Sequence, residues 1–474
     1  MADTQTIIGR RQELETLDRV FASRKSEFVI LYGRRRVGKT FLVNQKFSGL
    51  FTFRMTALSN ATLSQQLVNF HTTLAATAPH LAGDGPPVNW FAAFQSLIRL
   101  ASEDGRPRKV IFFDELPWFD VYGSDFLQAL EHFWNAWASL RSDVLLIGCG
   151  SAASWMINQL IHSPGGLHNR TTERILLPPF SLAETEEFMR SKGGVYDRYQ
   201  LLELYMAMGG VPYYLENVQV NRSVAQNIDR MFFLPGAMLN LEYGDLYRSL
   251  FSRAERHIAV VEALAQKSKG LSRKELLAAA GLPDGGAASA TLDELEQSGF
   301  VRRYFPFGKT KRDALYQLID AYTLFYLTFV KDSKAEGAGA WLAQSNGPRW
   351  RAWSGYAFEH VCRYHIESIK KQLGISGIYT EVSNWRSQRS ENGAQIDLLI
   401  DRSDRVINIC EIKFSVKAFT VTKDYADNLR NKLAVFREET GTNKTLFLTT
   451  ITTFGLNANE HSMQLVNDSL DMGA

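Results

Sequence analysis

The sequence predicts an α/β protein with more than one domain, and three observations support that prediction. Its 474 residues exceed the roughly 100–200 residues of a typical domain. An apolar strand near the N-terminus, Phe28–Tyr32, runs into a glycine-rich loop and then into a helix. Near the C-terminus, two more apolar strands, Gln395–Asp401 and Val406–Ser415, follow a Gly/Ala/Ser-containing linker at Lys331–Gly339.

The composition excludes several classes of protein. Hydrophobic residues make up 45% of the chain and charged residues 22%, which argues against extensive disorder and fibrous repeats. No apolar run approaches the ~18 residues that span a bilayer, and the first residues lack the pattern of a targeting signal. We therefore expect a cytoplasmic protein without a membrane partner. The three cysteines are too few and too scattered for a disulfide frame or a zinc site, so we expect them to be small buried hydrophobes: Cys149, Cys362 and Cys410.

The first motif, Gly-Arg-Arg-Arg-Val-Gly-Lys-Thr, matches the phosphate-binding pattern G-x-x-x-x-G-K-[ST] between a strand and a helix predicted at Phe41–Phe47. Glycine lets backbone N–H groups curl around phosphate oxygens, and the helix N-terminus adds a positive field. Lys39 is expected to reach the β and γ phosphates, and Thr40 to offer its hydroxyl to Mg²⁺. The sequence thus predicts that the whole loop binds ATP: Gly33, Arg34, Arg35, Arg36, Val37, Gly38, Lys39 and Thr40.

An acidic strand end supplies the second part of the predicted nucleotide site. The apolar run that starts at Lys109 ends in Asp114 and Glu115. Asp114 is expected to hold Mg²⁺ through water, and Glu115 to polarise the attacking water as general base. Another predicted strand, Leu50–Met55, lies between the loop strand and the acidic strand in sequence, as in NTPases with a catalytic glutamate (the ASCE type). This order favours hydrolysis over binding alone.

Three polar residues downstream each allow two interpretations. Ser151 follows the predicted strand Ser142–Gly150, where its hydroxyl either senses the γ-phosphate or caps the helix predicted at Ala152–Leu160. Arg170 and Arg174 precede a fifth apolar segment. Either one of them reaches the γ-phosphate of a neighbouring subunit, which predicts a homo-oligomer, or both are surface arginines.

Five motifs in order resemble the archaeal ATPase group of AAA+/STAND-like P-loop ATPases, over about residues 5 to 245. They are the glycine loop, Phe-Phe-Asp-Glu, Gly-Ser-Ala-Ala-Ser-Trp-Met (150–156), Pro-Phe-Ser-Leu-Ala-Glu-Thr (179–185) and Gly-Gly-Val-Pro-Tyr-Tyr-Leu (209–215). The resemblance implies a helical lid beside the nucleotide, with Pro212 as a sensor of the nucleotide state. Alternatively, Pro212 only starts a helix.

The middle of the chain predicts a winged helix-turn-helix. Three short helices, the second of them opened by a capping box at Ser272 and Glu275, are followed by a hairpin with a basic tip. Five cations within eleven residues suit contact with DNA phosphates: Arg302, Arg303, Lys309, Lys311 and Arg312. Winged helices also serve as rigid spacers and as docking faces for proteins, so both interpretations stay open.

Charged residues interrupt the C-terminal strands. Asp397 enters the first strand, and Glu411 and Lys413 lie two apart on the second, so they face the same side. Glu359 lies on a helix before them. Two carboxylates that share a divalent cation are stabilised, and a lysine beside them can steady a metal-bound hydroxide. The alternative is that all these side chains point to solvent.

The Glu359, Asp397, Glu411-x-Lys413 pattern resembles the PD-(D/E)xK nuclease superfamily, over about residues 350 to 450, with Ile396 as a departure from its usual motif. The resemblance implies a restriction-endonuclease-like α/β domain. Asp397 and Glu411 would be metal ligands for Mg²⁺ or Mn²⁺ and Glu359 an accessory ligand. Lys413 would be the catalytic lysine.

Together these motifs predict a P-loop ATPase core (1–185), a helical lid (186–247), a winged helix-turn-helix (248–332), a linker (333–349) and a nuclease-like domain (350–474). We expect an ATP-dependent or ATP-regulated DNA-binding protein with metal-dependent deoxyribonuclease activity, and the resemblances imply a role in genome defence or mobile-element biology. A second hypothesis is an ATPase switch that assembles or binds DNA or protein without cleaving it. A third is DNA translocation without cleavage.

Overall fold

The computed structural model describes residues 6–161, 170–334, 337–345, 347–388 and 393–473, and the chain divides into two compact units. The first contains Met1–Phe180, Val211–Tyr213 and Ser249–Ser252, and the second contains Ser181–Gly210, Tyr214–Arg248 and Arg253–Ala474. The domain boundaries predicted at residues 185, 247, 332 and 349 all fall inside the second unit. They stay predictions.

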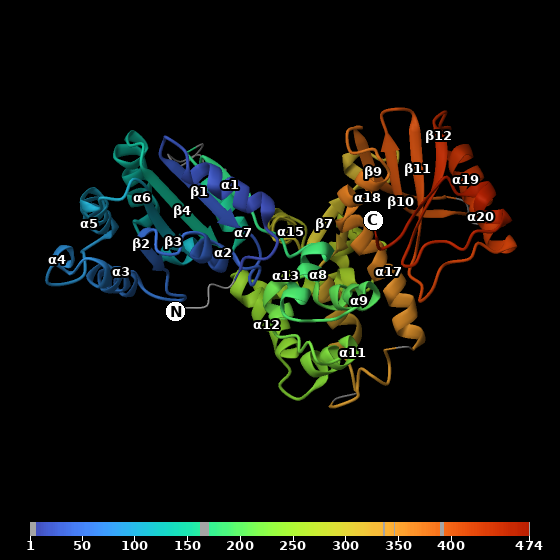
Figure 1. The fold of residues 1–474 in the computed structure, drawn as a ribbon, viewed down its shortest axis with the longest axis horizontal. Coiled ribbons are helices and arrows are strands. Elements are labelled where there is room, and N and C mark those ends of the chain that lie inside the picture. The colour runs from blue at the N-terminus through green and yellow to red at the C-terminus, as the bar shows by residue number, and fades with distance from the viewer. Residues whose placement is uncertain (1–5, 162–169, 335–336, 346, 389–392, 474) are drawn as a thin grey trace. The chain divides into compact units, whose positions relative to one another are not determined.

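The first unit is built on a parallel sheet with strand order β2-β3-β4-β1-β5 (Figure 1). Its strands are β1 (Glu27–Tyr32), β2 (Phe51–Thr56), β3 (Lys109–Asp114), β4 (Val144–Gly150) and β5 (Glu173–Leu176). In the sheet, β4 lies between the loop strand β1 and the acidic strand β3. The strand β2 lies between β1 and β3 in sequence, as predicted, but outside β3 in the sheet, because order along the chain does not fix order in a parallel sheet.

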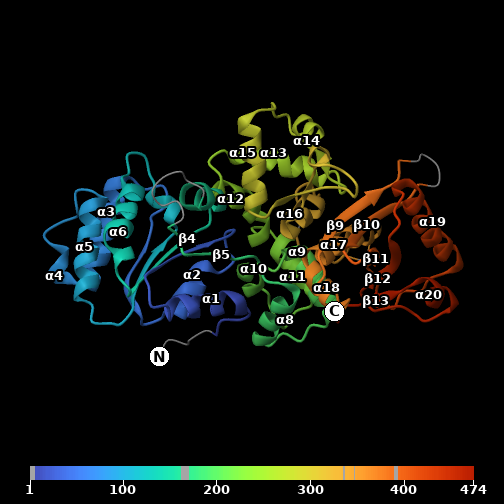
Figure 2. The same cartoon turned by 90° about the horizontal axis from the view of Figure 1, so that it is seen from above.

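Helices cover both faces of this sheet, because the side chains of each strand alternate between the faces (Figure 2). Phe28 and Ile30 of β1 pack with α3, α5 and α6, whereas Val29 and Leu31 pack with α1 and α2. The helical elements are α1 (Arg11–Phe21), α2 (Lys39–Lys46), α3 (Leu63–Thr77), α4 (Pro79–Ala82), α5 (Trp90–Glu103), η1 (Leu116–Phe119), α6 (Phe126–Ala136), η2 (Ala138–Leu140), α7 (Ala153–Trp155) and the π-helical η3 (Met156–Ile161).

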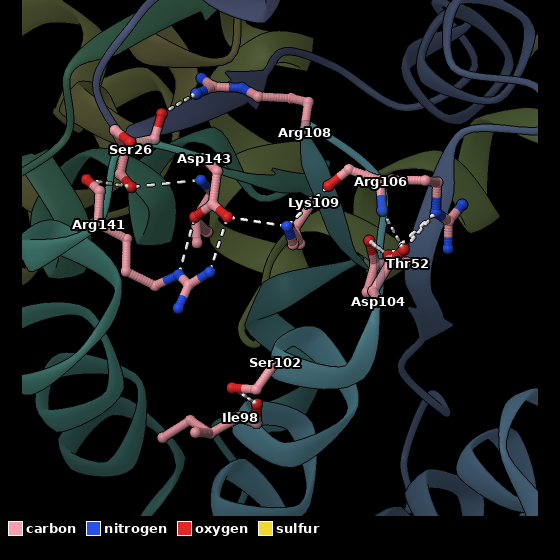
Figure 3. Close-up of polar contacts among 12 residues, drawn as sticks. Ser26, Thr52, Ile98, Ser102, Asp104, Arg106, Arg108, Lys109, Arg141 and Asp143 are labelled. Atoms are coloured by element: carbon pink, nitrogen blue, oxygen red, sulfur yellow. Dashed lines mark hydrogen bonds and ion pairs between the residues drawn. The ribbon is translucent and has the colours of Figure 1, made fainter.

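Ion pairs tie together the amino ends of the strands (Figure 3). Asp143, next to the start of β4, accepts hydrogen bonds from Arg141 at 2.8 and 2.7 Å and pairs with Lys109 of β3 at 2.8 Å. The hydrogen bonds from Arg141, aided by Lys109, lower the pKa of Asp143 to about 2 despite partial burial. Nearby, Asp104 accepts hydrogen bonds from Arg106 and Thr52. The predicted nucleotide site lies at the opposite, carboxyl ends of the strands, where the glycine loop follows β1 and Asp114 ends β3.

Helices form the first part of the second unit, and three helices with a small antiparallel sheet follow. The first helices are α8 (Leu182–Ser191), α9 (Arg198–Met208), α10 (Pro212–Glu216, which begins in the first unit), α11 (Val224–Ile228), η4 (Asp229–Phe233) and α12 (Met238–Leu250). Next come α13 (Ala254–Ala265), α14 (Arg273–Ala279) and α15 (Gly286–Gln297), with β6 (Leu271–Ser272), β7 (Val301–Tyr304), η5 (Lys311–Asp313) and β8 (Leu315–Leu318) in sheet order β6-β8-β7. The predicted hairpin and the capping box of Ser272 and Glu275 are present. The winged-helix assignment itself stays a prediction.

The segment predicted as a linker contains part of an aromatic core. Trp341 is only 1% exposed, and its ring contacts those of Phe329 and Trp350 at centroid distances of 5.2 and 5.3 Å. Its backbone N–H donates to Asp229 at 2.7 Å. The small residues around Trp341 predict a flexible connection, but burial of the large apolar Trp341 side chain fixes this segment against the core. The core includes α16 (Ala321–Phe325), η6 (Tyr326–Val330) and the start of α17 (Pro348–Tyr364).

The C-terminal part contains a mixed sheet of order β13-β12-β11-β10-β9. Its strands are β9 (Thr380–Arg386), β10 (Gln395–Arg402), β11 (Val406–Lys413), β12 (Thr445–Thr452) and β13 (Asp468–Leu470). β10 pairs antiparallel with β9 and β11, whereas β11, β12 and β13 are parallel. The helices are α18 (Ile366–Gln372), α19 (Lys423–Thr440) and α20 (Glu460–Leu465), with α17 on the opposite face from α19 (Figure 2).

Across the part of the chain that the structure describes, no helix is long and apolar enough to cross a bilayer.

Candidate functional site

The predicted phosphate loop connects β1 to α2 through backbone that requires glycine. Gly33 has φ +146°, and a Cβ there would lie 2.3 Å from the carbonyl oxygen of Leu177. Gly38, with φ +92°, caps α2, and no side chain accepts a hydrogen bond at that cap. Arg36 also has a positive φ of 71°. The loop therefore has the curled backbone that phosphate binding needs.

Lys39 spans this loop from the first turn of α2. Its buried ammonium donates to the carbonyl oxygens of Gly33 and Arg34 at 3.0 and 2.9 Å, and to the Ser151 hydroxyl at 3.0 Å. Burial lowers the pKa of Lys39, and the nearby acidic groups, Glu115 among them, oppose that shift. A desolvated cation aimed across the loop is suited to bind phosphate oxygens.

Thr40 and Asp114 form the predicted metal side of the site. The Thr40 hydroxyl lies 3.1 and 3.0 Å from the two carboxylate oxygens of Asp114, which is only 3% exposed. Neighbouring hydroxyl and carboxylate oxygens are the ligands that Mg²⁺ prefers, so these residues fit the predicted ion. Two further residues contact Asp114 that the sequence did not indicate as its neighbours. The Thr56 hydroxyl lies 3.4 Å from its carboxylate, and the thiol of Cys149 also contacts it.

Cys149 is buried as predicted, but it is more than a small hydrophobe. Its Sγ lies 2.6 Å from Oδ1 of Asp114, at the end of the neighbouring strand β4. Burial and the charge of Asp114 raise the pKa of the thiol well above its usual value, so the thiol stays protonated and donates. Cys149 thus fixes the orientation of the Asp114 carboxylate.

Ser151 links the lysine of the loop to the predicted general base. Its hydroxyl accepts from Lys39 and donates to Oε1 of Glu115 at 2.8 Å, and its N–H donates to Oε2 at 3.2 Å. The helix-cap interpretation of Ser151 is wrong, because α7 begins after Ala152 without a side-chain cap. Glu115 has a left-handed backbone (φ 55°), so its carboxylate is aimed by an unusual conformation at the end of β3.

Other parts of the first unit contact the loop or lie near it. The Arg36 guanidinium lies 4.3 Å from the ring centroid of Tyr213, and Arg10 donates to the carbonyl oxygen of Val37 at 3.1 Å. Arg10 and Tyr213 were missed, because neither belongs to the loop motif. Pro212 is the first residue of α10, and its predicted sensor role stays a prediction.

The two candidate arginine fingers are both exposed. Arg170 precedes β5, and Arg174 lies on β5 and donates to Thr171 at 2.9 Å. Their reach toward another subunit stays a prediction.

The second candidate site lies where β10, β11 and α17 meet. Leu398 pairs with Cys410, so Asp397 and Glu411 occupy the next opposed positions on β10 and β11. Glu359, Asp397 and Lys413 line one cavity of about 1240 Å³. Burial and the charge of Asp397 raise the pKa of Glu359 to about 7.

Glu411 is held by residues that the sequence did not single out. Its buried carboxylate accepts hydrogen bonds from the Tyr425 hydroxyl and from Lys432 at 2.8 Å, and it forms an ion pair with Lys413 at 3.0 Å. Burial alone would raise the pKa of Glu411, but Lys432 and Lys413 outweigh it, and the pKa is lowered. Tyr425 and Lys432 lie seven residues apart on α19, so helical periodicity after the Glu-x-Lys strand could have indicated them.

The predicted three-carboxylate metal set is not assembled. Among the described residues, no three His, Cys, Asp or Glu side chains are grouped as a metal site requires. At Glu411, two ammonium groups already lie against the carboxylate, those of Lys413 and Lys432. Asp397 in turn accepts from Gln395. Metal binding by Asp397 and Glu411 as a pair stays a prediction.

The predicted DNA-binding cations differ in accessibility. Arg302 donates to Gln317 at 3.1 Å, and burial and Arg363 lower its pKa to about 9, so it faces its neighbours in the sheet. Arg303 and Arg312 are exposed. Lys309 is exposed and lines the cavity of the second unit. The side chain of Lys311 lies outside the described residues.

A glycine loop after β1, a carboxylate pair after β3 and the strand order β2-β3-β4-β1-β5 define a P-loop ATPase fold. Residues 7–218 match the family model of an ATPase domain found predominantly in Archaea. This match supports ATP hydrolysis by the first part of the chain.

Proteins of two archaea are similar to this chain. The chain is 22% identical over 433 residues to an uncharacterized protein of Methanocaldococcus jannaschii, covering 90% of this chain and 92% of that protein. It is 50% identical over 38 residues to an uncharacterized ATP-binding protein of the same organism, covering 8% of this chain and 64% of that protein. The solved structure of a Walker-type ATPase of Pyrococcus abyssi has a TM-score of 0.51 and 18% identity, covering 68% of this chain and 96% of that one. This likeness shows a shared fold.

Proposed function

We propose that this protein hydrolyses ATP with Mg²⁺ at the carboxyl end of the first sheet, and that the nucleotide state controls a second unit that binds DNA. One observation carries the first part: Lys39, Ser151 and Glu115 form a continuous hydrogen-bonded chain. Thr40 and Asp114 lie in contact beside that chain's lysine and base. The ATPase family match and the ATP-binding relative support the choice of nucleotide.

The residues divide the work of hydrolysis among them. Loop N–H groups and Lys39 bind phosphate oxygens, while Thr40 and Asp114 hold the ion, which supplies charge neutralisation when bound. Glu115 orients water and accepts its proton. Ser151 contacts both Lys39 and Glu115, so it positions the base relative to the phosphate-binding lysine.

The test compares phosphate release and nucleotide binding in Lys39→Ala, Glu115→Gln and a control, Lys46→Ala. Lys46 is the last residue of α2 and pairs with Asp18. Lys39→Ala should lose both binding and turnover. Glu115→Gln should bind ATP yet turn over about 100-fold or more slowly, because the base is lost. Wild-type turnover in Glu115→Gln would overturn the assignment of the base.

DNA binding by the second unit is supported by the hairpin at β7 and β8 and its exposed cations. Arg303, Lys309 and Arg312 place positive charge on one short stretch, as phosphate contact requires. Arg303→Ala with Arg312→Ala should weaken duplex binding and lower the salt slope by about 1 per lost contact, measured by fluorescence anisotropy. Arg437→Ala, an exposed arginine on α19, is the control. An unchanged salt slope would contradict phosphate contact by the hairpin.

Metal-dependent cleavage is a second candidate function, favoured because Glu359, Asp397 and Lys413 line the same cavity. The ion-paired state of Glu411 favours the alternative, a switch that binds without cutting. Plasmid incubated with ATP and Mn²⁺ or Mg²⁺ separates the two. Asp397→Asn and Lys413→Ala should abolish cleavage and keep ATPase activity if the site is a nuclease, whereas a binding switch shows no cleavage to lose.

Assembly into homo-oligomers is supported by the exposure of Arg170 and Arg174, either of which can reach a neighbour. In that case the specific ATPase activity rises with protein concentration and falls in Arg170→Ala or Arg174→Ala. Specific activity that is independent of concentration and of both substitutions would contradict an arginine supplied by another subunit.

A further inference from the structure

The Glu411 carboxylate is enclosed by hydrogen-bond donors. It is 7% exposed, and each of its oxygens has a donor: Oε1 accepts from Tyr425 and also pairs with the Lys413 ammonium, and Oε2 accepts from Lys432. A buried carboxylate is unstable without such partners. The side chains of this chain thus already supply the positive charge that a buried anion needs.

Positive groups already surround the predicted carboxylate ligands. Lys413 and Lys432 pair with Glu411. The charges of Arg363 and Lys413 act on Glu359, which lines the cavity together with Lys413. A divalent cation entering this set would stand beside two ammonium groups that share its ligand. It would gain a full carboxylate only if one of them left.

Lys432 is the cation whose removal frees an oxygen of Glu411. Its ammonium lies 2.8 Å from Oε2, whereas the more exposed Lys413 shares Oε1 with the Tyr425 hydroxyl. Lys432 extends from α19, whereas Lys413 lies on the same strand as Glu411. The Lys413 ammonium lies 5.1 Å from the centroid of the Tyr425 ring. Displacing Lys432 frees one oxygen of Glu411 without breaking the strand.

We propose that the Lys432 ammonium competes with a divalent cation for Glu411, so that the second unit binds metal only when Lys432 is displaced. The inference rests on the proposed metal site of the second candidate function. It assigns Lys432 as a positioning residue that sets metal affinity.

The experiment titrates Mn²⁺ by calorimetry into the full-length protein without nucleotide, in an Asp114→Asn background that removes the metal ligand of the first unit. Adding Lys432→Ala or Lys432→Met should create or tighten one Mn²⁺ site by about tenfold or more. Adding Glu411→Gln as well should remove that site. Lys432→Arg keeps the positive charge and should show no gain.

A matched control is Lys444→Ala, because Lys444 pairs with Asp401 on the same sheet. It should leave Mn²⁺ binding unchanged, and thermal unfolding checks that each variant is folded. Equal Mn²⁺ affinity with and without Lys432 would overturn the inference, as would a gain that survives Glu411→Gln. Because the readout is metal binding, absence of cleavage in every variant would overturn the nuclease proposal and leave this one standing.

Discussion

Ser151 shows how one side chain can couple two functions of a site. It is the only residue in the Lys39–Ser151–Glu115 chain that contacts both ends, through an hydroxyl 3.0 Å from Lys39 and 2.8 Å from Glu115. Without it, Glu115 would keep its place directly after β3 but lose the partner that orients its carboxylate. The hydroxyl should therefore matter to turnover more than to affinity.

Ser151→Ala should lower the ATPase turnover number by about 10- to 100-fold, because the general base is no longer held in place. The dissociation constant for ATP should change little, since the loop backbone and Lys39 remain. Ser151→Thr, which keeps the hydroxyl, is the matched control. A Ser151→Ala protein with weakened ATP binding and normal turnover would place the residue in binding instead.

Asp143 carries a charge that stabilises the first unit in a pH-dependent way. Hydrogen bonds from Arg141 lower its pKa to about 2, below the roughly 3.9 of an unfolded chain. A depressed pKa stabilises the fold fully above the unfolded value, and the contribution is lost as pH falls through about 2. The shift corresponds to about 2–3 kcal/mol at neutral pH.

Asp143→Asn should therefore lower the unfolding temperature of the first unit at pH 7, and the gap from wild type should narrow between pH 4 and pH 2. Differential scanning calorimetry across that range measures the gap. Asp84→Asn, at an exposed residue, should show no such trend. A gap that stays constant with pH would mean that the Asp143 charge is not the cause.

At the scale of elements, helix α9 contacts the C-terminal sheet within the second unit. The ring of Tyr199 stacks on Phe414 at 5.1 Å and on Phe454 at 5.7 Å. Phe414 directly follows Lys413, and its ring also lies 5.7 Å from that of Phe358 on α17. The stack thus supports the end of β11 that carries Lys413.

Tyr199→Ala should lower the free energy of unfolding by about 1–3 kcal/mol, because two ring contacts are lost with their buried area. Denaturant unfolding measures the loss, and Tyr199→Phe should keep most of the stability. If Tyr199→Ala and Tyr199→Phe are equally stable, the ring stack contributes nothing and the contact is incidental.

Local patterns were predictable from the sequence, and distant contacts were not. The loop from Gly33 to Thr40 and the pair Asp114 and Glu115 follow from spacing alone, because neighbours in sequence determine that geometry. Tyr213 reaches Arg36 from outside the motif, and Lys432 reaches Glu411 from a later helix. No single-residue pattern encodes such approaches, which depend on packing.

Topology shows the same limit. β2 follows β1 and precedes β3 in sequence, but parallel strands are joined by crossovers, and in the sheet β4 lies between β1 and β3. Trp341 gives another example. The composition around it predicts a linker, but its side chain is buried in an aromatic core. The hydrophobic pattern of the sequence located the helices and strands, but it did not show which of them lie next to one another.

At the scale of the whole molecule, the proposal requires that nucleotide state in the first unit alters DNA binding in the second. The two variants of the nucleotide site provide the needed states. Glu115→Gln should retain bound ATP because hydrolysis is blocked, whereas Lys39→Ala should not retain it. Both leave the cations of the second unit intact.

We expect DNA affinity to differ by about fivefold or more between Glu115→Gln with ATP and Lys39→Ala with ATP, the lower range of typical coupling between two sites. Fluorescence anisotropy with a labelled duplex measures it. Wild type should shift from one affinity to the other as ATP is consumed, and Lys46→Ala should behave as wild type. If all four proteins bind DNA equally with and without ATP, the ATPase does not control DNA binding, even if both sites are assigned correctly. Reciprocity then offers a second check, since DNA that favours the ATP-bound state must raise the affinity of Glu115→Gln for ATP by the same factor.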